Sequence, residues 1–157
     1  NPESDPLGQG YQLIQSKIAL GSGGSSGKGF LQGTQSYLEY LPEKQTDFIF
    51  TLIGEEFGFL GSIFIIILYL ILITQCFLVS IKSNHSFGRF LALGIGSNLF
   101  IYVIMNISMV SGLMPVVGIP LPLISYGGTV MLTIIVSMGL VLNIDINYNK
   151  KKLSNNA

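Results

Sequence analysis

The sequence predicts an all-α, polytopic integral membrane protein with three membrane-spanning helices and one large extramembrane loop. Only 10% of the 157 residues are charged and the mean hydropathy is +0.60, whereas about a quarter of a soluble domain is charged. The charge-free runs at 57–81 and 90–144 are long, and ~20 apolar residues are enough to cross a hydrocarbon core. This distribution excludes an ordinary soluble domain, and no nucleic-acid partner is expected.

Residues 1–45 form the predicted extramembrane loop, because they are polar and rich in glycine. The chain does not begin with Met and shows no signal-peptide pattern, so we expect it to begin inside a loop of a larger protein. The segment GSGGSSGKG at 21–29 is either a flexible linker, which its composition favours, or a nest of amides that binds an anion. In the second case Lys17 and Lys28 would meet a phosphate.

The first membrane helix is predicted at 46–81, with an extracytoplasmic lead-in before the apolar segment. A continuous helix of this length measures roughly 50 Å at ~1.5 Å per residue, which is longer than one crossing requires. We therefore expect it to tilt, to project from the membrane, or to bend near Gly54 or Gly58.

Two further helices follow a short loop at 82–86. The second helix is predicted at 87–110 and the third at 123–144, before a tail at 145–157. Between them, the prolines at 115, 120 and 122 exclude an uninterrupted helix. Residues 111–122 are therefore interpreted as a proline-rich re-entrant turn.

The positions of the basic residues predict the orientation of these helices. The 82–89 connection and the tail contain five of the eight cationic residues, and cytoplasmic loops carry an excess of Lys and Arg. Three crossings then place residues 1–45 and the proline-rich turn together on the outer face.

Asp47 is the candidate acid–base residue. The sequence LEYLPEKQTDFIF at 38–50 brings Glu39, Glu43 and Asp47 to the edge of the first apolar run. Asp47 lies between polar and apolar neighbours, an environment in which carboxylates are partly desolvated and often tuned for catalysis. Glu55 and Glu56 lie roughly 80° and 180° around the helix from Asp47, and we expect them to snorkel or to pack against helices that this segment lacks.

The proline-rich turn is either a rigid helix connector or the wall of a binding site, and its composition favours neither. Irregular backbone inside a membrane must be buried in protein or line a polar cavity. The sequence SYGG at 125–128 permits a tight turn and brings the hydroxyls of Ser125, Tyr126 and Thr129 close to it.

The remaining reactive side chains have no predicted chemistry. Cys76 is the single cysteine, cannot form an internal disulfide and is expected to pack in the apolar run. His85 is expected in a solvated loop, and no cluster of metal ligands is evident in the sequence.

Four segments resemble the SEDS family of bacterial membrane proteins, which includes RodA, FtsW and SpoVE. They are GYQLIQSKIALGSGG at 10–24, GKGFLQGTQSYLEYLPEKQTDFIF at 27–50, GEEFGFLG at 54–61 and NISMVSGLMPVVGIPLPLISYGG at 106–128. QGTQS at 32–36 and MPVVGIPLP at 114–122 look more like the elongation branch than the division branch. The resemblance implies the C-terminal part of a ten-helix, multi-pass protein of the bacterial inner membrane.

The resemblance also implies an activity. Family members polymerise lipid II into the glycan strands of peptidoglycan during cell elongation and shape maintenance, together with a class B penicillin-binding protein. The family's essential aspartate matches Asp47, which we expect to be the general base in an inverting glycosyl transfer. Lys28, Glu39, Ser125 and Tyr126 are expected to bind substrate, with Lys28 near the pyrophosphate. A divalent cation that bridges Asp47 and pyrophosphate is compatible with this chemistry, although no ligand set in the chain requires it.

Two other functions stay open on the sequence alone. A flippase for the lipid precursor would use broken helices and polar groups inside the membrane, but the acidic residues gather at one face. A scaffold would only recruit the penicillin-binding protein. Because this segment lacks the family's other helices, we expect it to be inactive alone.

Overall fold

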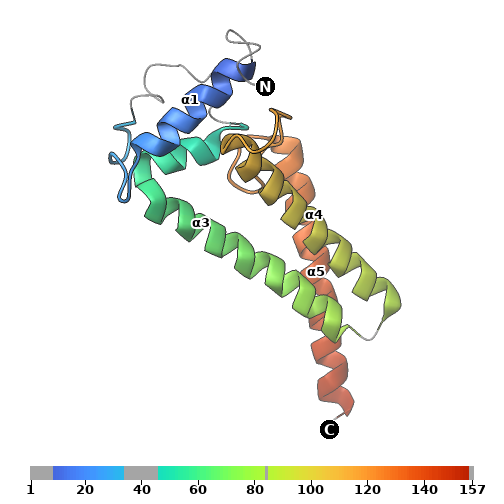
Figure 1. The fold of residues 1–157 in the computed structure, drawn as a ribbon. Coiled ribbons are helices and arrows are strands. Elements are labelled where there is room, and N and C mark those ends of the chain that lie inside the picture. The colour runs from blue at the N-terminus through green and yellow to red at the C-terminus, as the bar shows by residue number, and fades with distance from the viewer. Residues whose placement is uncertain (1–8, 34–45, 84, 156–157) are drawn as a thin grey trace.

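The computed structural model describes residues 9–33, 46–83 and 85–155, and all regular elements in these ranges are helices (Figure 1). The predicted all-α fold class is thus confirmed. Three helices are long and apolar enough to cross a membrane, and a fourth, α1, belongs to the predicted extramembrane loop. The helices are α1 (Gln9–Ser22), α3 (Ile49–Lys82), α4 (Ser86–Val110) and α5 (Gly128–Asn155).

Different segments of the chain gather at the two ends of the molecule (Figure 1). Helix α1, the N-terminal part of α3 and the irregular 111–127 segment lie at one end, whereas the α3–α4 connection and the C-terminus lie at the other. This arrangement places the basic 82–89 connection and the tail together, opposite Asp47 and the proline-rich turn. Asp47 and the turn therefore lie at the same end of the molecule, and the side of the membrane that this end faces stays a prediction.

Helix α3 is broken at Gly58, one of the two positions at which a bend was expected. Gly58 has φ 67° and ψ −160°, a conformation that is essentially restricted to glycine. A Cβ at this position would also collide with the backbone of the 25–27 segment. The helix therefore changes direction here, and its N-terminal part lies beneath α1 (Figure 1).

The glycine-rich loop fills this break, so the flexible-linker interpretation is wrong. The amides of Lys28 and Gly29 donate to the carbonyls of Glu55 and Glu56, at 3.1 and 3.0 Å. In return, the carbonyls of residues 24 and 25 accept from the amides of residues 59 and 60, at 2.9 and 3.2 Å. The interrupted helix thus recovers the hydrogen bonds that its break removes, as irregular backbone in an apolar environment requires.

The third spanning helix begins at Gly128 and continues to Asn155, so it starts and ends later than the predicted 123–144 segment. Residues 111–127 contain no helix, and Leu123 has a positive φ of 67°. The turn therefore extends to Gly127 and includes most of the SYGG sequence. Residues 145–155, which belong to the predicted tail, continue the helix.

The main core lies where α1, α3, α4 and the proline-rich turn meet. Its buried residues are Phe48, Phe50, Tyr69, Ile73, Leu99, Val103, Met109, Val110 and Leu121. A second cluster near the α3–α4 connection contains Cys76, which is 2% exposed, as its predicted packing role requires. Gly96 allows α4 to approach α3 there, since a Cβ on Gly96 would lie 2.9 Å from the Cys76 Cβ.

Candidate functional site

Asp47 immediately precedes Phe48, the N-cap residue of α3. Its exposed fraction is only 8%, and the neighbouring Phe48 is fully buried. The carbonyl of Phe48 accepts the first helical hydrogen bonds, from the amides of Thr51 and Leu52. A buried aromatic anchor and the start of the helix therefore hold the backbone of Asp47 on one side.

The proline-rich turn holds Asp47 on the other side. A Cβ on Gly118 would lie 3.2 Å from Asp47 Oδ2, so the carboxylate rests against the turn at its glycine, where φ is 70°. The Ser125 hydroxyl, 79 residues away in sequence, donates to the Thr46 carbonyl. The sequence predicted that Asp47 and the turn share one face of the membrane, and the structure shows them in contact.

Asn106 on α4 connects Asp47 to the turn. Its Nδ2 donates to the Asp47 carbonyl at 2.8 Å and to the Ile119 carbonyl at 2.7 Å. Because both partners are carbonyls, the NH₂ group must face them. The side chain is fully buried, and its Oδ1 has no hydrogen-bond partner within the described part of the chain.

Sequence reasoning missed Asn106, although one signal was present. An amide inside an apolar spanning segment is costly and usually has a function, and Asn106 lies four residues before the end of α4. An amide between the apolar Met105 and Ile107 was the available clue.

Tyr69 gives the turn a further anchor from the middle of α3. It is 4% exposed, and its hydroxyl donates to the Pro122 carbonyl. Together, Tyr69, Asn106 and Ser125 provide side-chain donors to backbone carbonyls in and around the turn. These contacts fix the turn as a rigid surface beside Asp47.

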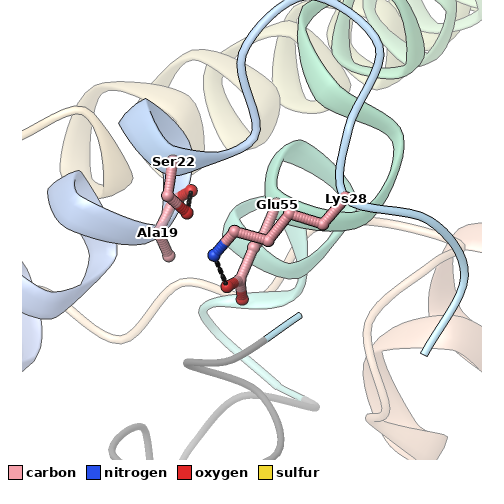
Figure 2. Close-up of polar contacts among 4 residues, drawn as sticks. All are labelled: Ala19, Ser22, Lys28 and Glu55. Carbon is pink, nitrogen blue, oxygen red and sulfur yellow. Dashed lines mark hydrogen bonds and ion pairs between the residues drawn. The ribbon is translucent and has the colours of Figure 1, made fainter. Parts of the chain in front are cut away.

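Lys28 is directed at a buried carboxylate (Figure 2). Its Nζ lies 2.7 Å from Glu55 Oε1, and the two side chains are 26% and 1% exposed. Glu55 lies eight residues beyond Asp47, about 12 Å along a helix at 1.5 Å per residue. The snorkelling interpretation of the two glutamates is therefore wrong, because Glu55 pairs with Lys28 within this chain and Glu56 is also buried.

The other predicted site residues have different surroundings. Ser125 is 7% exposed, whereas Tyr126 is 79% exposed at the edge of the turn. Glu39 lies outside the described residues. Within the described ranges, no three His, Cys, Asp or Glu side chains gather into a possible metal site, so a cation at Asp47 would need most of its ligands from elsewhere.

The fold and the site define a multi-pass α-helical membrane protein with a buried carboxylate at one end of its spanning helices. The family model for the FtsW, RodA and SpoVE proteins, described as cell cycle protein, matches residues 1–150. The chain therefore belongs to this family, as its four motifs indicated, and is a multi-pass protein of the bacterial inner membrane.

Individual relatives are similar over nearly the whole chain. Peptidoglycan glycosyltransferase MrdB of Escherichia coli strain K12 is 51% identical over 154 residues, which cover 98% of this chain and 41% of the relative. Peptidoglycan glycosyltransferase RodA of Treponema pallidum is 40% identical over 145 residues, with coverages of 92% and 34%. The chain thus spans about two fifths or less of the length of these relatives.

A solved structure supports the same assignment. It comes from work on the structural coordination of polymerization and crosslinking by a peptidoglycan synthase complex. The similarity has a TM-score of 0.72 at 34% identity and covers 92% of this chain and 38% of that chain. The helices described above therefore have the arrangement found in this family.

Proposed function

We propose that this chain provides part of the active site of a peptidoglycan glycosyltransferase, with Asp47 as the general base. The observation that carries the proposal is the position of Asp47, whose buried carboxylate lies between the start of α3 and a proline-rich turn fixed by side-chain donors. A carboxylate held in one position suits proton transfer. The names of the relatives support the reaction class.

The proposed reaction extends a glycan strand with lipid II as its precursor. A hydroxyl of the acceptor sugar attacks the anomeric carbon of the donor sugar and forms a new C–O bond. The bond to polyprenyl pyrophosphate breaks with inversion, and its electron pair leaves with the pyrophosphate. Asp47 takes the proton of the attacking hydroxyl, so no covalent glycosyl-enzyme is needed.

Four residues are proposed to bind substrate. Lys28 keeps part of its side chain exposed while it pairs with Glu55, and this exposed part would contact the pyrophosphate. Tyr126 offers an exposed hydroxyl beside the turn, and Ser125 orders the backbone before Asp47. Glu39 stays a proposal from the family resemblance.

The proposed topology places residues 1–45 and the re-entrant turn 111–122 outside the cytoplasm. The 82–86 loop and the tail from residue 145 would lie inside it. The proposed partner is a class B penicillin-binding protein that crosslinks the strands, and the polymerization and crosslinking complex among the similar structures supports it. In this topology Asp47 faces the compartment in which the cell wall is assembled.

The test is a chimera of the E. coli relative in which this chain replaces the matching region, purified with the crosslinking partner. Lipid II polymerisation is compared between the parent chimera and Asp47→Asn, with glycan length resolved on a gel. We expect at least a 100-fold loss of rate, within the ~10²–10⁴-fold range of general-base catalysis. Asp145→Asn, at the opposite end of the molecule, is the matched acid-to-amide control and should retain activity.

Intact folding and partner binding in the Asp47→Asn chimera are required for this interpretation. Unchanged polymer length and rate would exclude Asp47 as the base. If lipid II movement across vesicles were lost instead, the result would favour the flippase. The break in α3 does not itself favour transport, since the glycine-rich loop fills it with protein backbone.

A further inference from the structure

Asn106 lowers the stability of the fold through its buried amide oxygen, and packing alone does not explain why an amide is present there. The side chain is fully buried and its Oδ1 has no partner among the described residues, and a buried acceptor without a hydrogen bond reduces stability. Leucine has a similar size and would bury no polar atom. The reason for an amide at this position must therefore lie in what its NH₂ group holds.

The NH₂ group holds two backbone segments that are distant in sequence. One bond reaches the carbonyl of Asp47, 59 residues before Asn106, and the other reaches the carbonyl of Ile119, 13 residues after it. Ile119 follows Gly118, whose backbone supports the Asp47 carboxylate. A single amide therefore fixes both the main chain of Asp47 and the surface against which its side chain rests.

We propose that Asn106 is the positioning residue for Asp47, an inference that rests on the proposed glycosyltransferase function. Asn106 does not contact the reacting atoms. It fixes the Asp47 peptide relative to the proline-rich turn, and thereby fixes the direction from which the carboxylate meets the acceptor hydroxyl. A displacement of about 1 Å at a reacting group can cost ~10²-fold in rate, so the loss of this link should reduce turnover much more than substrate binding.

The test uses Asn106→Leu in the chimera described above. Leucine keeps the volume of the side chain and removes both donors. We expect the maximal rate of lipid II polymerisation to fall at least tenfold, while KM changes less than twofold.

Ser16→Ala is the matched control, because Ser16 is also fully buried and also ties the end of α4. Its hydroxyl is bonded to the Val110 carbonyl at 3.0 Å and to the Thr51 hydroxyl at 2.8 Å, and neither partner belongs to Asp47 or to the proline-rich turn. Both variants are compared by their thermal midpoints. For each variant we compare the loss of polymerisation rate with the fall in thermal midpoint. If this ratio is the same for Asn106→Leu and Ser16→Ala, Asn106 has only a structural role.

A second background separates this inference from the proposed base. In Asp47→Asn, the Asn106→Leu change should cause no further loss of the residual rate, since the group that Asn106 positions is already absent. An equal loss in both backgrounds would show that Asn106 acts independently of Asp47 and would overturn the inference.

Hydrogen exchange gives a readout that does not depend on polymerisation. Asn106→Leu should speed amide exchange both at the start of α3 and in the 118–121 segment, whereas Ser16→Ala should not accelerate both together. If Asp47→Asn kept full activity, the base assignment would fail, and exchange would still decide whether Asn106 links the two segments. If Asn106→Leu fails to fold, Asn106→Ser replaces it, because serine retains one donor. A loss of polymerisation rate no larger than that of Ser16→Ala at the same thermal midpoint would overturn the inference.

Discussion

Two stretches of irregular backbone interrupt the apolar part of this chain, and different chemical groups stabilise them. The break at Gly58 is filled by main-chain amides and carbonyls of the glycine-rich loop. The 111–127 turn is held mainly from outside, by the side chains of Tyr69 and Asn106. The second region contacts Asp47 at Gly118.

The difference follows from which backbone groups each interruption leaves without partners. A helix break at glycine exposes both N–H and C=O groups, and another backbone segment can satisfy both. Proline has no N–H, so a turn with three prolines has an excess of carbonyls and needs donors from side chains. The first region therefore depends on the absence of side chains at its glycines, and the second depends on the presence of particular donors.

The largest expected effect is at the glycine of the first region. Gly58→Ala would force a Cβ into the 25–27 backbone at a φ of 67°. Strain of ~1–3 kcal/mol and overpacking of similar size should together destabilise the fold by about 3 kcal/mol or more. Thermal unfolding of the chimera in detergent measures this change.

Gly21→Ala provides the control for that measurement, because Gly21 lies in α1 near the same loop and a Cβ there meets nothing within 4 Å. This variant should be neutral or slightly stabilising, since alanine favours helix over glycine by ~1 kcal/mol. Equal thermal midpoints for the two variants would show that close backbone contact does not stabilise the break.

Lys28 adds a side-chain ion pair to the first region, and the next prediction tests how much this pair contributes. Lys28→Met removes the cation that pairs with a carboxylate that is 1% exposed. We expect it to destabilise the fold by about 2 kcal/mol, which is less than the ~3–5 kcal/mol lost when a fully buried ion pair is broken. Adding Glu55→Gln should recover part of this loss. If the double variant is no more stable than Lys28→Met, the ion pair contributes little.

The same pair of variants tests the proposed substrate contact. If Lys28 binds pyrophosphate, the KM for lipid II should rise in the double variant even when its stability recovers. An unchanged KM would leave Lys28 with its structural role alone.

The sequence predicted the features that depend on local composition. Long apolar runs defined the three spans, Gly58 was one of two expected bends, and the basic residues placed Asp47 and the turn on one face. Asn106 was missed because its partners lie 59 and 13 residues away, and an isolated amide has no periodic pattern. The association of the glycine-rich loop with α3 was missed for a related reason. It consists of backbone hydrogen bonds, so the glycines are the sequence feature that reflects it.

Helix α1 shows a third limit of local reasoning. Its segment is polar and contains glycine, and short helices in water are marginal without tertiary packing. Leu13, Ser16 and Ala19 are buried, and Ser16 is bonded to α3 and α4. The helix is therefore stabilised by elements that come much later in the sequence.

The smallest expected effect is at Tyr69, which anchors the second region. Tyr69→Phe removes the donor to the Pro122 carbonyl while it keeps the aromatic ring, and should cost about 1–2 kcal/mol because a buried acceptor loses its partner. Tyr102→Phe is the control, since the Tyr102 hydroxyl makes no hydrogen bond to the described residues, and its thermal midpoint should not change. Because Tyr69 anchors the turn at Pro122 rather than beside Gly118, its loss should reduce polymerisation less than the loss of Asn106. A larger loss of rate from Tyr69→Phe would mean that the whole turn, rather than its link to the Asp47 carbonyl, positions the carboxylate.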